Sequence, residues 1–204
     1  MRSLFIDTTS FFMSIAIVEN DVVLKRIEEQ IERDMSSKII PFIEECFNSV
    51  SFELKDIDKL FIVNGPGSFT GVRIGVTVAK VIGWSFNIDV IPLSSLEVLA
   101  STSIEEKYRI PVIDARRGYV FSAVYDVNLD NIVEDKYRLL NDLDEYKKEG
   151  QFISHDIDNS VKPNIDIIKV INLHKNDKPI NPHKLKPNYL KLTEAEENVR
   201  NKND

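Results

Sequence analysis

Three short runs of β-branched and other apolar residues open the chain, and polar turns separate them. The runs cover 4–6, 13–18 and 22–24, with hydroxyl-bearing residues after the first run and Asp21 before the third. Apolar runs of this length that are bounded by turn residues are typical of strands. The pattern therefore predicts three consecutive antiparallel strands.

An amphipathic pattern follows from Ser37 to Val50. Apolar residues recur there at helical spacing, while Glu44 and Glu45 fall on the opposite side. This pattern predicts a helix that buries one of its faces. The apolar positions are Ile39, Ile43, Cys46, Phe47 and Val50.

The next feature is a strand, a tight loop and a helix in direct succession. The apolar run 60–63 leads into a loop that ends at Gly71, and a helical apolar period continues to about Phe86. Five of the seven glycines lie between Gly65 and Gly83, so backbone freedom is concentrated in this stretch. The candidate site residues here are Gly65, Pro66, Gly67, Ser68, Phe69, Thr70, Gly71 and Arg73.

This loop would suit an anion, because a helix N-terminus offers unpaired N–H groups and the positive end of the helix dipole. Its spacing nevertheless matches neither standard phosphate loop. Val72 and Arg73 stand where a Walker loop has its lysine and hydroxyl residue, and Thr70 stands at the third glycine of a dinucleotide loop. A nucleotide loop is therefore a minor alternative.

Small residues recur every four positions along the predicted helix, at Gly71, Gly75, Ala79 and Gly83. They form a stripe that another element can approach closely. The stripe could pack on the chain's own sheet, but the helix is apolar around most of its circumference, which favours a partner on one side. We expect leucine at Gly75 to block such a partner without unfolding the chain. The predicted partner interface comprises Ile39, Ile43, Phe47, Val72, Gly75, Val76, Ala79 and Ile82.

Later elements are predicted with less pattern to support them. A strand at 88–91, a short helix capped by Ser94 and a polar stretch at 101–107 precede a hairpin formed by 110–113 and 119–125. Beyond Asp126, only 152–154 and 165–171 look strand-like. These signals divide the chain into an N-terminal lobe, 1–103, a smaller lobe, 104–192, and a charged tail, 193–204.

Composition limits the expected cellular location and the expected binding partners. Among 204 residues there is one cysteine, Cys46, so no intrachain disulfide can form, and no apolar run reaches the roughly 18 residues that span a bilayer. We therefore expect a cytoplasmic protein without a membrane partner. The formal net charge of −7 disfavours direct binding to a phosphate backbone, and the basic stretch 174–186 is interpreted as a solvated face.

The run Gly-Pro-Gly-Ser-Phe-Thr-Gly-Val-Arg-Ile-Gly at 65–75 resembles the hallmark motif of the TsaB/YeaZ family. Three further matches follow the family's order: Ile-Asp-Thr-Thr at 6–9, Asp-Ala-Arg-Arg at 114–117 and Pro-Asn-Tyr-Leu-Lys at 187–191. The resemblance implies an α/β fold of the actin/hexokinase/Hsp70-like (ASKHA, ribonuclease H-like) type, with two lobes and a reduced C-terminal lobe.

The resemblance also implies a function. The family is similar to a non-catalytic paralogue of the enzyme TsaD, and it serves the threonylcarbamoyladenosine modification of tRNA next to the anticodon. The implied partners are a TsaD-type catalytic subunit, bound through the two long N-lobe helices, and a TsaE-type ATPase. ATP and threonylcarbamoyl-adenylate would be used by that complex, tRNA would be reached mainly through the partners, and the chain alone would form homodimers.

Two enzymatic alternatives remain open. An ATP-dependent kinase of the same fold would need phosphate loops in both lobes, whereas Asp7-Thr8-Thr9 lacks the glycine of such a loop. A peptidase-like homodimer would need a nucleophile beside a histidine, but all three histidines are late and isolated in the sequence. The same isolation argues against a metal site. We predict no catalytic, metal or intrinsic cofactor residues, and we interpret the histidines as surface or loop residues: His155, His174 and His183.

Overall fold

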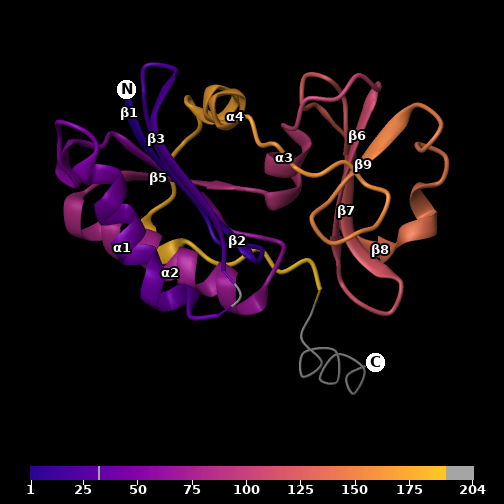
Figure 1. Cartoon of the computed structure of the whole chain (residues 1–204), viewed down its shortest axis with the longest axis horizontal. Coiled ribbons are helices and arrows are strands. Elements are labelled where there is room, and N and C mark those ends of the chain that lie inside the picture. Colours follow the sequence, from indigo (N-terminus) through magenta and orange to yellow (C-terminus); the bar gives the residue numbers. More distant parts are fainter. Residues whose placement is uncertain (32, 192–204) are drawn as a thin grey trace.

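A computed structural model describes residues 1–31 and 33–191, so the predicted charged tail, 193–204, lies outside the described residues. The chain forms two lobes, each built on a β-sheet, with one short helix between them (Figure 1). This architecture confirms the predicted two-lobed α/β fold. Within the described part of the chain, no helix has the length and hydropathy needed to cross a membrane.

The first lobe contains a five-stranded sheet in the order β3-β2-β1-β4-β5. The predicted antiparallel strands β1, β2 and β3 are confirmed, while β4 and β5 extend the sheet in parallel with β1. The bounds are β1 Arg2–Asp7, β2 Phe12–Glu19, β3 Val22–Gln30, β4 Lys59–Val63 and β5 Asp89–Leu93.

Helices cover both faces of this sheet. The long helices α1 (Met35–Asn48) and α2 (Phe69–Phe86) lie side by side on one face, and α4 (Ile167–His174) packs on the other (Figure 1). Alternation along β1 explains the division, because successive side chains of a strand point to opposite faces. Leu4 and Ile6 join the core under α1 and α2, whereas Phe5 joins the core under α4.

The second lobe is a four-stranded sheet in the order β8-β7-β6-β9. The predicted hairpin is confirmed as β6 and β7, and β9 pairs in parallel with β6. The sequence did not reveal β8, which pairs antiparallel with β7. The bounds are β6 Tyr108–Asp114, β7 Tyr119–Tyr125, β8 Asn131–Leu139 and β9 Gly150–Ile153, with α3 (Ser95–Ala100) between the lobes.

The C-terminal part of the predicted second lobe belongs to the first lobe instead. Residues 167–174 form α4, not a strand, and they pack against Phe5 and Phe61 of the first sheet. The chain then continues along the first lobe, where the Ile180 N–H donates to the Val90 carbonyl at 2.9 Å and Leu185 is buried in the core. The assignment of 104–192 to one lobe is therefore wrong from about Ile167 onward. We call residues 178–191 the C-terminal strap.

Candidate partner-binding face and interlobe cleft

The small-residue stripe of α2 packs against the chain's own first lobe. A Cβ atom added at Gly75 would collide with the Thr8 hydroxyl and lie 3.2 Å from Ile62 Cδ1. One added at Gly83 would collide with Val90 and lie 3.1 Å from a ring carbon of the strap's Pro182. The absence of side-chain bulk therefore lets α2 approach its own sheet closely.

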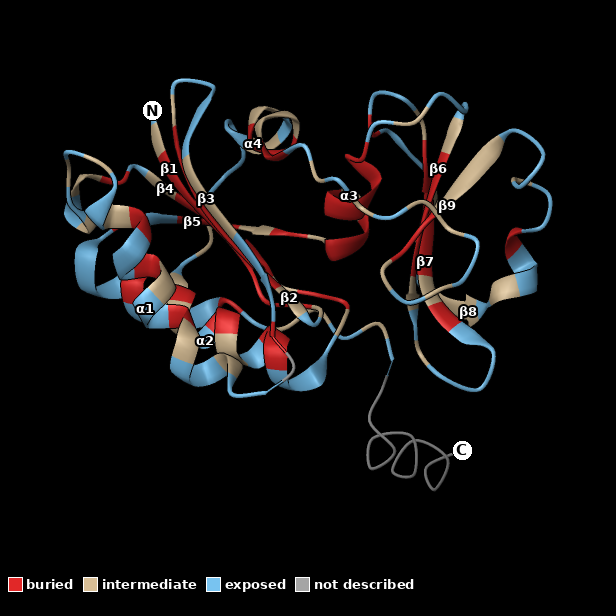
Figure 2. Cartoon of the chain, viewed as in Figure 1, coloured by how far each residue is buried: buried red, intermediate tan, exposed pale blue. Residues whose placement is uncertain are grey.

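The predicted partner interface needs correction for this reason. Seven of its eight residues are buried inside the first lobe, and Phe47 is partly buried. Because the sheet and the inner sides of the two helices already cover the seven buried side chains, these residues have little surface left for a partner (Figure 2). The residues concerned are Ile39, Ile43, Phe47, Val72, Gly75, Val76, Ala79 and Ile82.

The opposite side of the same two helices is exposed and partly apolar. Trp84 is 66% exposed, Val81 58%, Phe69 50% and Ile40 47%. A groove of about 470 Å³ runs between α1 and α2, and Ile40 and Phe69 are part of its lining. Exposed apolar side chains gathered on one face mark interaction sites in monomeric chains. We call this surface the outer face and define it by Ile40, Phe69, Arg73, Ile74, Thr77, Val78, Lys80, Val81 and Trp84.

Arg73 is held in place on the outer face by two aromatic rings. Its guanidinium carbon lies 3.7 Å from the centre of the Phe69 ring, which in turn stacks with Tyr189 at 5.7 Å. The Arg73 Nε–H donates to the Tyr189 hydroxyl at 2.8 Å. The strap motif at 187–191 thus supports a residue of the glycine-loop motif, a contact that their separation in the sequence does not reveal.

The glycine loop packs against the loop that connects β1 to β2. The Ser68 N–H donates to the Thr9 carbonyl at 2.7 Å, and the Thr8 hydroxyl donates to the Gly71 carbonyl at 2.8 Å. The Ser68 hydroxyl accepts a bond from the Gly71 N–H and so caps α2. A side chain at Gly67 would collide with the Thr9 carbonyl. The loop therefore uses Gly67 for close packing, and the N–H groups of Ser68 and Gly71 bond to protein acceptors.

An interlobe cleft of about 780 Å³ lies where the sequence motifs of the two lobes meet. Four carboxyl groups line it, from Asp7, Asp34, Asp114 and Asp156, together with the guanidinium groups of Arg33 and Arg116. Burial raises the pKa of Asp7, and hydrogen bonds from the Thr9 N–H and hydroxyl lower it in part. A cleft with this charge set offers little attraction to the phosphates of a nucleotide.

The histidines occupy three different environments. His183 lies on the surface beside Trp84, and His155 lies in the loop after β9, so both fit the prediction of surface or loop residues. His155 packs against Phe11 and Phe12, and its burial lowers its pKa. His174 ends α4 and bridges it to α3, a role that the prediction of a surface or loop residue missed. Within residues 1–31 and 33–191, no group of three His, Cys, Asp or Glu side chains could hold a metal ion.

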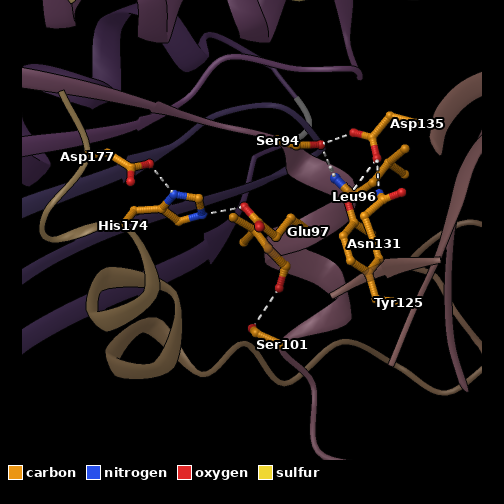
Figure 3. Close-up of polar contacts among 10 residues, drawn as sticks. Ser94, Leu96, Glu97, Ser101, Tyr125, Asn131, Asp135, His174 and Asp177 are labelled. Carbon is orange, nitrogen blue, oxygen red and sulfur yellow. Dashed lines mark hydrogen bonds and ion pairs between the residues drawn. The ribbon is translucent and has the colours of Figure 1, made fainter. Parts of the chain in front are cut away.

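Polar bonds at α3 connect the lobes (Figure 3). His174 Nε2 lies 2.7 Å from a carboxylate oxygen of Glu97 on α3, and His174 Nδ1 lies 2.7 Å from Asp177. At the start of α3, Ser94 donates to Asp135 of β8, which also accepts from the Tyr125 hydroxyl at 2.7 Å. These contacts fix α3 between the two sheets.

Two lobes, each built on a mixed β-sheet, with a cleft between them agree with the class of protein that the sequence resemblance implied, the actin/hexokinase/Hsp70-like fold. A family model described as "TsaD: tRNA N6-adenosine threonylcarbamoyltransferase" matches residues 23–180. A tRNA threonylcarbamoyladenosine biosynthesis protein TsaB from Bacillus subtilis is 32% identical, with 96% of each chain covered. The chain belongs to the TsaB/YeaZ family.

Two further relatives agree with this family. The TsaB protein of Escherichia coli is 34% identical over 61% of this chain and 55% of its own length. The solved structure of YeaZ from Pseudomonas aeruginosa superposes with a TM-score of 0.75 and 18% identity, covering 93% of this chain and 99% of that one. The second similarity concerns the fold alone.

Proposed function

We propose that this chain is a non-catalytic scaffold subunit in the biosynthesis of threonylcarbamoyladenosine on tRNA. The name of the Bacillus subtilis relative supports the pathway, because that protein is similar along nearly the whole chain. The observation that carries the scaffold role is the outer face, where large apolar side chains of α1 and α2 stand exposed to solvent.

The proposed partner is a TsaD-type catalytic subunit. A TsaD family model matches 23–180 of this chain, a range that includes α1 and α2, so we expect a TsaD-type enzyme to have related helices. Two proteins with related two-helix faces can pair by nearly symmetric packing, as identical subunits do about a two-fold axis. The same face would join two copies of this chain when the enzyme is absent.

The remaining parts of the proposal concern small molecules and tRNA. ATP and threonylcarbamoyl-adenylate are handled by the TsaD-type subunit and a TsaE-type ATPase, which this chain helps to recruit. The four aspartates of the cleft support this division of labour, and so do the protein acceptors that the Ser68 and Gly71 N–H groups already bond. The net charge of −7 favours tRNA contact through the partners.

Reconstitution tests the pathway. The chain is mixed with the TsaD-type enzyme, the ATPase, threonylcarbamoyl-adenylate and tRNA, and modified adenosine is measured with and without the chain. We expect its omission to abolish or strongly reduce modification. Undiminished modification would remove the proposed function, and tight magnesium-dependent ATP binding by the isolated chain would favour the kinase instead.

A variant pair tests the face. Trp84→Glu places a charge on the outer face, and Val127→Glu makes the same kind of change at a residue of the second lobe that is 50% exposed. We expect Trp84→Glu to weaken co-purification with the TsaD-type subunit more than tenfold, because hot-spot aromatics dominate interface energies. Val127→Glu should bind normally, and equal binding by both variants would contradict the assignment of the face.

A further inference from the structure

The charges of α2 follow a simple pattern. Its only charged residues are Arg73 and Lys80, and both are cations on the outer face. They are seven residues apart, which places them nearly two turns and about 10 Å apart along one side of the helix. In the described part of the chain, neither residue forms an ion pair.

The guanidinium group of Arg73 is also preorganised for binding a ligand. Its Nε–H is bonded to Tyr189, and stacking on Phe69 fixes the plane of the guanidinium. An arginine has five N–H donors, and the four on the terminal nitrogens have no acceptor among the described residues. A planar fork of this kind matches the two oxygens of a carboxylate, and the rings have already removed much of its side-chain freedom.

Apolar surface accompanies these cations. Phe69, Ile74 and Val78 line the groove between α1 and α2, next to Arg73. The exposed residues Val81 and Trp84 follow Lys80 by one and four positions. An amphipathic helix fits such a groove through apolar anchors at helical spacing. Phosphates of RNA would gain from the two cations but not from the apolar groove, and the net charge of −7 opposes their approach.

We propose that the outer face receives a partner helix whose acidic side chains, about two turns apart, pair with Arg73 and Lys80 while its apolar side fills the groove. This inference rests on the proposed function and names the feature by which the TsaD-type subunit is recognised. Arg73 would take its carboxylate in a bidentate bond and Lys80 would take the second one as a point charge. Complementary charges of this kind select the partner and set the register of two helices.

Charge reversal is the test. The dissociation constant between this chain and its TsaD-type subunit is measured for the wild type, Arg73→Glu, Lys80→Glu and the double variant, at about 0.05 M and about 0.5 M NaCl. We expect each reversal to weaken binding by about tenfold and the double variant by about a hundredfold, because the sites are far enough apart to act additively. Lys136→Glu, at an exposed position of β8, is the matched control and should bind like the wild type.

Compensation identifies the partner residues. Single Asp→Lys and Glu→Lys changes on the two long helices of the TsaD-type subunit should restore binding of Arg73→Glu or Lys80→Glu at one position each. The two restoring positions should lie about seven residues apart. Thermal unfolding of each variant reports on the fold, and Lys80→Glu leaves the stack of Phe69, Arg73 and Tyr189 untouched.

The outcomes separate this inference from the proposed function. If Trp84→Glu abolishes binding while both reversals leave the affinity and its salt dependence unchanged, the charge pairing is wrong and the scaffold role stands. If the reversals weaken binding of tRNA rather than of the TsaD-type subunit, the cations serve phosphates and the inference is overturned. If the wild-type chain does not bind the TsaD-type subunit, both proposals are removed.

Discussion

His174 should make the stability of this protein depend on pH across the neutral range. Its imidazole lies between Glu97 and Asp177, 2.7 Å from a carboxylate oxygen of each, and its side chain is only 19% exposed. The hydrogen bond to Glu97, with smaller contributions from Asp177, raises the pKa of His174 to about 9 despite burial. The charged imidazole therefore holds α4 against α3 (Figure 3).

The direction in which stability changes with pH follows from comparing the pKa of His174 in the folded and unfolded states. The unfolded pKa is about 6.5, so below that pH the histidine is charged in both states and the full stabilisation is present. Between about pH 6.5 and 9 the unfolded chain loses the proton while the folded chain keeps it, and stability falls as pH rises. Above the folded pKa the contribution is lost. The shift corresponds to about 3 kcal/mol at most, and about 2 kcal/mol after allowance for partial exposure.

The assay is urea denaturation followed by far-ultraviolet circular dichroism at several values between about pH 6 and pH 10. For His174→Gln, we expect about 2 kcal/mol lower stability at pH 6 and a flatter dependence up to pH 9. His183→Gln, at an exposed histidine, is the control and should follow the wild-type curve. Parallel curves for the wild type and His174→Gln would refute the reasoning.

Two other predictions concern the core. Gly75→Ala should lower the free energy of unfolding by about 1–3 kcal/mol in the same assay, because the added methyl group meets Thr8 and Ile62. Gly75→Leu should likewise damage the fold rather than block a partner selectively, whereas Thr77→Ala on the outer face should change stability by less than about 0.5 kcal/mol. Burial raises the pKa of Cys46 to about 11, so its thiol should resist alkylation at about pH 8 until the chain unfolds. Rapid alkylation of the folded chain would contradict this placement.

The first lobe was predictable because the spacing of its apolar residues is regular within each strand and helix. The continuous apolar run of β1 is typical of a strand buried on both faces, the helical apolar spacing of α1 indicates one buried face, and Ser94 caps α3 as its spacing suggests. The β-branched residues of 165–171 suggested a strand, yet Ile167, Val170 and Ile171 follow helical spacing and all face the core. The Asp166 side chain also accepts a hydrogen bond from the Lys169 N–H. This helix cap distinguishes a helix from a strand in this segment.

The second lobe was less predictable because its signals are polar or distant. β8 has the sequence Asn-Ile-Val-Glu-Asp-Lys-Tyr-Arg-Leu. Because it is an edge strand that buries little surface, it lacks the apolar run from which a strand is predicted. The pairing of Tyr189 with Arg73 and of His174 with Glu97 joins positions far apart in the sequence. Side-chain patterns within one element cannot reveal such contacts.

The predicted partner interface was misplaced, and the order of the elements around α2 could have shown this from the sequence. The helix α2 follows β4 directly and precedes β5, and these strands are parallel neighbours in one sheet. A strand–helix–strand crossover packs its helix back onto the sheet, so the stripe that permits the closest approach must face that sheet. A stripe of small residues shows that another element packs closely against the helix. The connectivity of the chain shows that this element is its own sheet. What favours a partner is therefore the apolar surface left on the opposite side, where Val81 and Trp84 have no role in the chain's own core.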